Sequence, residues 1–217
     1  MDWAEAIERA TARYEDGQTR LPDEADARQR QLTRMGNAAY AAGLCALMAG
    51  RDGDAREWLA RAAARYRESW EDAPPGSWGR PVAILKSRVL AGDERELREA
   101  ALWTLQQDAA AGESPIAKYA AALSLLVLED WEHARLHADD LRTHDGFPAA
   151  VGDALAYIAA EDVLGYIDAV ETVLESFEAR DEYLEDVPVA DTVLVLQALA
   201  ARRDMAAHDL SSPLLPR

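Results

Sequence analysis

The sequence predicts an all-α protein, built of antiparallel helical hairpins that form a compact array or a short superhelix. Apolar residues recur every three or four positions along most of the chain, which is the period of a helix with one buried face. Clusters of glycine, proline and aspartate separate these stretches. No stretch alternates with the period of two that indicates a half-buried β-strand. We therefore expect about nine or ten helices and no sheet.

Two helices are expected in the first part of the chain. Residues 2–14 form the opening helix, and residues 18–22 form a loop. Pro22 is suited to start the second helix, because the first helical position needs no backbone N–H group. The second helix begins with a polar half rich in arginine and glutamine and then becomes apolar. One face of the opening helix carries Trp3, Ile7, Ala10 and Tyr14.

The clearest hairpin runs from Asn37 to Trp70. In its turn, AGRDGD at 49–54, two glycines can take a positive φ at little cost, and Asp52 or Asp54 can cap the next helix. Small residues line the first helix and allow the second to approach closely: Ala39, Gly43, Ala46 and Gly50. The second helix carries its apolar residues at helical spacing: Ala55, Trp58, Leu59, Ala62, Tyr66 and Trp70.

This hairpin resembles a tetratricopeptide unit, whose two helices carry small residues where they cross. The residues at matching offsets are Gly43, Ala55, Leu59 and Ala62. The tryptophan and tyrosine of that family's first helix are absent, and so is its closing proline at the matching position. The likeness covers about one unit well and the rest of the chain in outline. It implies an architecture of stacked helix pairs and carries over no catalytic residue.

The chain is expected to form a single helical domain, 1–217. The segment 73–81, APPGSWGRP, is its sharpest interruption, and it either separates two subdomains or forms an ordered loop over a groove. Further helices are expected over 81–90, 94–108, 115–127, 131–142, 149–160, 162–179 and 189–202. The tail that follows contains two prolines and is expected to be extended. Its segment 210–216 either docks on another subunit or partner or packs over the chain's own core.

Composition excludes several classes of protein. No apolar run approaches the roughly 20 residues of a membrane span, and the N-terminus lacks the basic region of a secretory signal, so we expect a cytoplasmic protein. The single cysteine, Cys45, excludes an intramolecular disulfide and a multi-cysteine zinc site. A buried structural thiol is the favoured interpretation of Cys45, and a redox or nucleophilic role is the alternative.

The net charge of −17 is strongly acidic, with 40 acids against 23 bases. Only two of these bases, Lys86 and Lys118, are lysines. This composition resembles that of proteins from salt-loving microbes, because excess carboxylates repel one another unless salt screens them. We hypothesise that the fold needs molar salt; an ordinary acidic bacterial protein is the alternative. The same charge argues against binding to nucleic acid, which requires a clustered basic surface.

The first candidate site places an aromatic ring and three bases within eleven residues: Trp78, Arg80, Lys86 and Arg88. Such a patch could bind a carboxylate or phosphate of a ligand, or an acidic segment of a partner. Alternatively, Trp78 buries its ring and the bases pair with nearby acids. Two weaker candidates lie further along the chain.

The second candidate is a metal site formed by His133, His137 and Asp140 on one face of a helix, although solvated histidines explain the same pattern. The third is an acidic stretch over 143–201, which has 13 acids and one base, Arg180. We expect Glu171, Glu175, Glu178 and Glu182 to line one helical face. Such carboxylates could act as acid and base or bind cations, but a solvated face explains them without chemistry.

These observations favour a non-enzymatic adaptor or scaffold that binds a protein or peptide, with residues 78–88 at the binding surface. Self-association through exposed tryptophans is a related alternative. The rival class is an enzyme or a small-molecule or metal-binding protein with a pocket near Trp78–Arg88. No nucleotide-binding glycine loop, nucleophile elbow or metal motif is recognised, so no catalytic residue, metal or cofactor is assigned.

Overall fold

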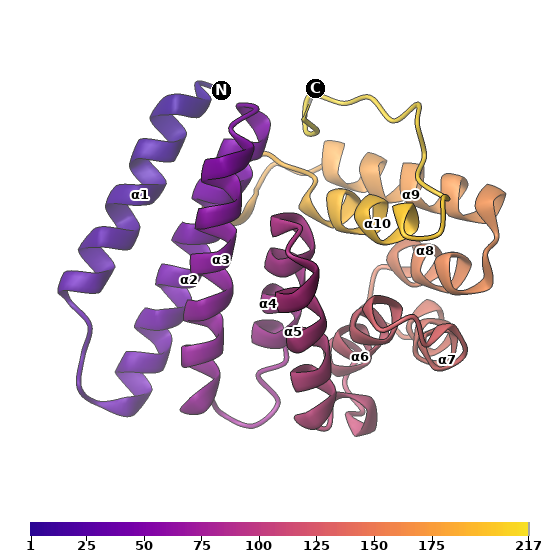
Figure 1. Cartoon of the computed structure of the whole chain (residues 1–217), viewed down its shortest axis with the longest axis horizontal. Helices are drawn as coiled ribbons and strands as arrows, with labels where there is room; N and C mark the ends of the chain where they lie inside the picture. Colours follow the sequence, from indigo (N-terminus) through magenta and orange to yellow (C-terminus); the bar gives the residue numbers. More distant parts are fainter. Residues whose placement is uncertain (217) are drawn as a thin grey trace. The chain divides into compact units, whose positions relative to one another are not determined.

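The computed structural model describes residues 1–216, and its regular secondary structure over that range is all helical (Figure 1). It contains ten α-helices and two 3-10 helices and, within those residues, no strand, which confirms the predicted fold class. The elements are α1 (Trp3–Thr19), α2 (Ala25–Met48), α3 (Asp52–Glu71), α4 (Gly79–Ala91), α5 (Glu94–Gln106), η1 (Ala109–Ala111), α6 (Pro115–Val127), α7 (Trp131–Arg142), α8 (Ala149–Ala160), α9 (Val163–Glu178), η2 (Leu184–Asp186) and α10 (Asp191–Ala201). None of these helices is both long and apolar enough to cross a membrane.

The chain forms two compact units. Among the described residues, the first comprises 1–92, 181–189 and 213–216, and the second comprises 93–180 and 190–212. The segment 73–81 lies within the first unit, since α3 and α4 on its two sides pack against each other. The chain passes from one unit to the other between Gly92 and Asp93. The expectation of a single domain over 1–217 stays a prediction.

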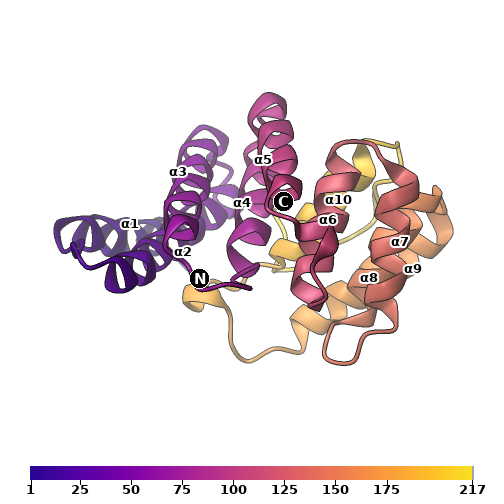
Figure 2. The ribbon, with the colours of Figure 1, turned by 90° about the horizontal axis from the view of Figure 1, so that it is seen from below.

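In the first unit, α1 packs against α2, α2 against α3 and α3 against α4 (Figures 1 and 2). The stripe of small residues lies where α2 crosses α3, because a Cβ at Gly43 would stand only 2.7 Å from Leu59 Cγ. Gly50 takes a φ of 68° at the turn, whereas Gly53 lies in the first turn of α3. The hairpin that the sequence predicts is therefore present.

Two predictions of helix starts in this unit are wrong in detail. Helix α2 begins at Ala25 and not at Pro22, because the Glu24 carboxylate accepts hydrogen bonds from the backbone N–H groups of Asp26 and Ala27. Neither Asp52 nor Asp54 caps α3, whose N-cap residue is Arg51. The Asp54 carboxylate instead accepts a hydrogen bond from Arg51 Nε at 2.6 Å.

In the second unit, α6, α7, α8 and α9 likewise pack in sequence, with α5 against α6 and α10 against α8 and α9. Ser114 caps α6 as predicted, accepting a hydrogen bond from the Ala117 N–H at 3.2 Å. Arg203 caps the C-terminal end of α8, because its guanidinium donates hydrogen bonds to the carbonyls of Ile158 and Ala159 at 2.8 Å each. This contact satisfies carbonyls that the last turn of a helix leaves without partners.

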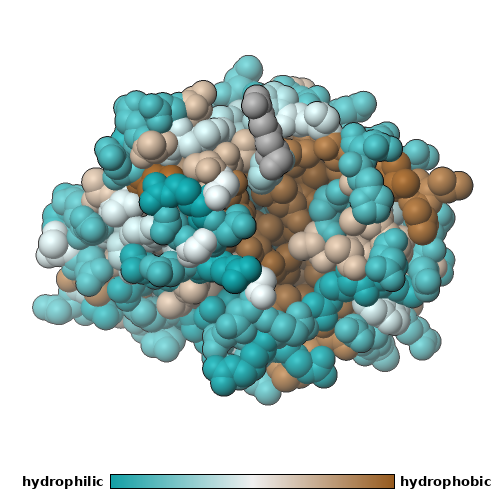
Figure 3. Space-filling model, turned by 45° about the horizontal axis from the view of Figure 1, so that its top comes forward, coloured by the Kyte–Doolittle hydropathy of each residue, from teal (hydrophilic) through white to brown (hydrophobic). Residues whose placement is uncertain are grey.

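The tail forms no helix over residues 205–216, but turns at 208–209 and 213–214 interrupt the extended conformation that the sequence predicts. Leu214 and Leu215 are both buried, so the tail packs back on its own chain and its last residues belong to the first unit. Much of the face in Figure 3 is hydrophilic, with an apolar area exposed within it.

Candidate functional site

Arg80, the central base of the first candidate, is held inside the first unit. Its Nε donates to Ser69 Oγ at 2.7 Å, and its Nη2 donates to Gln29 Oε1. Gln29 and Ser69 are 3% and 0% exposed, and Ser69 also donates to the Gln29 carbonyl at 2.8 Å. Burial lowers the pKa of Arg80 below its usual range. Arg80 therefore joins α2, α3 and α4 through a polar network.

The other three residues of this candidate lie on the same segment. The Trp78 ring packs on Trp70, with their centroids 5.3 Å apart. Lys86 and Arg88 are half-buried on α4. These contacts agree with the interpretation that Trp78 packs on its own chain, and they give Arg80 internal partners. A ligand site at residues 78–88 stays a prediction.

The histidine stripe on α7 is divided among separate partners. His133 Nδ1 lies 2.8 Å from Asp130 Oδ1, and this carboxylate raises the pKa of His133. His137 is half-buried, which lowers its pKa, and Asp140 accepts a hydrogen bond from Lys118 Nζ at 2.6 Å. Within residues 1–216, no three histidine, cysteine or acidic side chains are grouped so that they could hold a metal ion.

The acidic stretch does not form the single face that the sequence predicts. Glu171, Glu175 and Glu178 are exposed on α9, but the helix ends at Glu178 and Glu182 lies beyond it. The expected four-residue stripe is therefore wrong at its last member. Cys45 is fully buried in α2, and its burial raises the pKa of the thiol to about 11.

The structure brings five charged side chains together around a hollow in the first unit, which sequence reasoning missed. Its volume is about 480 Å³, and α1, α2 and η2 form its walls. We call it the arginine hollow. It is lined by Arg13, Asp16, Gly17 and Arg20 from α1 and the residue after it, by Gln31, Arg34, Met35 and Ala38 from α2, and by Glu185 from η2.

The three guanidinium groups of the arginine hollow differ in their partners. Arg13 Nη1 lies 2.8 Å from Glu185 Oε2, and Arg20 pairs with Asp16 one turn earlier along the helix. Arg34 makes no side-chain hydrogen bond or ion pair with any residue that the structure describes. Three positive groups therefore face two carboxylates, in a chain whose net charge is −17.

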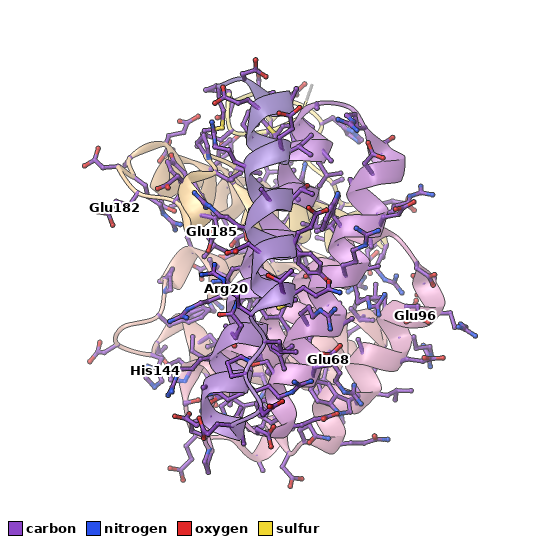
Figure 4. The ribbon with its side chains drawn as sticks, turned by 90° about the vertical axis from the view of Figure 1, so that its left-hand side faces the viewer. Arg20, Glu68, Glu96, His144, Glu182 and Glu185 are labelled. Atoms are coloured by element: carbon purple, nitrogen blue, oxygen red, sulfur yellow. The ribbon has the colours of Figure 1, made fainter. Side chains whose placement is uncertain are left out.

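A second hollow of about 190 Å³ shares Arg13 and Glu185 with the arginine hollow and adds Arg9 to the lining. Figure 4, which looks onto α1, shows Glu185 beside this helix and Arg20 near its end. The spacing of Arg9, Arg13 and Arg20 along one helix was a signal available in the sequence. The placement of Arg34 and Glu185 beside them was not, because residues 13 and 185 are far apart in the chain.

Chemically, the arginine hollow is suited to bind an anion. A guanidinium presents its N–H donors as a planar fork that matches a carboxylate or a phosphate. Gln31 adds an amide, although its Nε2 already donates to the Gly17 carbonyl at 3.2 Å. Comparisons of the chain with models of protein families, with curated proteins and with solved structures each found no match, so its function is argued from its own residues.

Proposed function

We propose that the protein is a non-enzymatic interaction protein, an adaptor or scaffold of the tetratricopeptide-like kind, that holds an anionic partner protein at the arginine hollow. The observation that carries this proposal is a cavity of about 480 Å³ lined by three arginines in a chain of net charge −17. Arginine is enriched at the centres of protein interfaces, where its fork binds carboxylates with defined geometry.

The arrangement of the helices supports the same proposal. They pack in adjacent antiparallel pairs within each unit, as in helical arrays, whose stacked pairs offer extended surfaces to partner proteins. Fold alone does not fix function, so the weight rests on the charged cavity and not on the architecture. We place the protein in the cytoplasm of a salt-adapted organism, on the grounds of its acidic, lysine-poor composition.

Affinity capture from the native cytoplasm at high salt, followed by mass spectrometry, tests this proposal. The variant Arg20→Glu/Arg34→Glu reverses two charges of the arginine hollow, and both side chains are exposed. Arg56→Glu is the matched control, since Arg56 is exposed on α3 and lies outside the lining of the hollow. We expect a stoichiometric partner to be retained by the wild type and by Arg56→Glu and lost from the double variant. Retention by all three proteins would remove the proposal.

A further inference from the structure

The arginine hollow already receives one carboxylate from the chain itself. Segment 181–189 is acidic, and its Glu185 is the residue that pairs with Arg13. The Glu185 side chain is only 23% exposed, and Val187 and Val189 on the same segment are buried. Glu182, by contrast, is exposed and points away from the protein in Figure 4. The segment thus presents a single carboxylate to the arginines.

The backbone of segment 181–189 takes an unfavourable conformation at Glu185. Glu185 has a φ of 54° and Asp186 a φ of 60°, so two consecutive residues with side chains occupy the left-handed region. Residues other than glycine rarely adopt this conformation, and it persists only where surrounding contacts impose it. Glu185 is therefore held by its pairing with Arg13 and by the buried valines, and an external carboxylate would compete with a strained internal one.

Glu185 neutralises one of the three guanidinium groups of the arginine hollow, and Asp16 pairs with a second. Arg34 has no partner among residues 1–216, and Arg20 pairs only with Asp16, on a side chain that is 69% exposed. The volume of about 480 Å³ lies within the roughly 300–1,000 Å³ of typical ligand pockets. There is room for a ligand with more than one carboxylate.

We propose that the arginine hollow binds an acidic peptide segment of a partner protein, whose carboxylates pair with Arg20 and Arg34 and take the place of Glu185 against Arg13. This inference rests on the proposed function and names the chemistry of the partner. The chain supplies its own example of the binding mode, because the group that it places against Arg13 is a carboxylate on the acidic segment 181–189.

The spacing of the arginines indicates the spacing of the ligand's acids. Arg13 and Arg20 are seven residues apart, which is about 10 Å along a helix at a rise of about 1.5 Å per residue. An extended peptide advances about 3.3 Å per residue and turns alternate side chains to opposite faces, so acidic residues four positions apart share one face and lie about 13 Å apart, a distance that two long arginine side chains can match. A capped peptide with two glutamates at this spacing is the probe, and the same peptide with glutamines is its control.

Titration of labelled peptide, followed by fluorescence anisotropy at fixed high salt, measures the dissociation constant for each variant. We expect the glutamate peptide to bind the wild type and the glutamine peptide not to bind. Glu185→Gln removes the internal competitor and should tighten binding about tenfold, the scale of one charge-assisted contact. Glu182→Gln makes the same charge change on the same segment and should leave binding unchanged. Arg34→Gln should weaken binding about tenfold.

Three results would overturn the inference. The first is equal affinity of the glutamate peptide for the wild type and for Arg34→Gln. The second is equal affinity for the wild type and for Glu185→Gln, which refutes displacement of the internal carboxylate. The third is binding of inorganic phosphate, titrated in parallel, without binding of the peptide. Arg34→Gln keeps the test decisive if Glu185→Gln unfolds, since Arg34 has no partner to lose. The capture experiment tests the proposed function separately, because it detects an anionic partner whether or not an acidic peptide segment makes the contact.

Discussion

Replacement of Arg80 by methionine tests whether this residue stabilises the fold or serves to bind a ligand. Methionine keeps an unbranched apolar side chain and removes the guanidinium that donates to Gln29 and Ser69. Both partners are buried, so they lose a charged donor in a place that water does not reach freely. We expect Arg80→Met to destabilise the first unit and not to act on binding alone.

The size of the effect follows from the two hydrogen bonds. A hydrogen bond to a charged group contributes about 1.5–3 kcal/mol, and a buried acceptor left without a donor costs about 1–3 kcal/mol. Part of this loss is offset, because the variant has no guanidinium to desolvate on folding, and the lowered pKa of Arg80 indicates that this desolvation is unfavourable. Ser69 retains its contacts with Thr33 and with the Gln29 carbonyl, which limits the loss. We therefore expect the free energy of unfolding to fall by about 2–3 kcal/mol.

Unfolding in urea, followed by circular dichroism at constant salt, is the appropriate assay, since guanidinium chloride would itself screen the charges of this acidic chain. Arg56→Met on the exposed side of α3 serves as the control, and we expect it to change stability by less than about 0.5 kcal/mol. If Arg80→Met were as stable as Arg56→Met, the structural role of Arg80 would be refuted, and the ligand-binding interpretation of residues 78–88 would gain support.

Three further predictions concern packing, pH and salt. Gly43→Ala should lower the free energy of unfolding by about 1–2 kcal/mol, because its Cβ would stand 2.7 Å from the Cγ of buried Leu59. Gly53→Ala is the control, since its Cβ would meet open space and should not destabilise the protein. A Gly43→Ala protein as stable in urea as the wild type would contradict this. The pKa of His133 in the folded protein should lie above its ordinary value of about 6.5, so protonation of His133 stabilises the fold at low pH and this contribution is lost as pH rises through the raised pKa. The pKa of His137 should lie below its ordinary value, so protonation of His137 destabilises the fold as pH falls through the lowered pKa. An NMR titration that gives the reverse order of the two pKa values would refute both assignments. The melting temperature should rise steeply with salt, and full helicity with an unchanged melting temperature in low-salt buffer would refute the salt requirement.

The hairpin of α2 and α3 was predictable because its determinants are local. Apolar period, small residues and a glycine turn lie within about three dozen positions, and each acts on its immediate neighbours. Predictions failed where two local signals competed. Pro22 is a good first helical residue, but the carboxylate of Glu24 satisfies the N–H groups of the next turn and starts α2 later. Glu182 continues the period of α9 in sequence, although the helix has already ended at Glu178.

The arginine hollow was not predictable by these means, because its charge balance depends on contacts between distant residues. Most ion pairs that hold other arginines here are local, such as Arg9 with Glu5 and Arg51 with Asp54. Such a pair on an exposed helix surface is weak, so it lowers the affinity of an arginine for a partner without removing it. Arg34 differs in that no described acid reaches it, and Arg13 differs in that its acid comes from position 185, 172 residues away.

The partners of an arginine therefore decide whether it can bind a ligand. They explain why the structure favours the arginine hollow as the binding site, whereas the sequence favours residues 78–88. Residues 78–88 look like a binding patch in sequence because their charge is concentrated, yet the structure directs Arg80 inward to Gln29 and Ser69. The arginines of α1 and α2 look ordinary in sequence, yet they line a cavity that also receives the carboxylate of Glu185, a residue with a positive φ. In an acidic chain, charge density therefore indicates where arginines lie, and only their partners indicate which of them remain available for an anion.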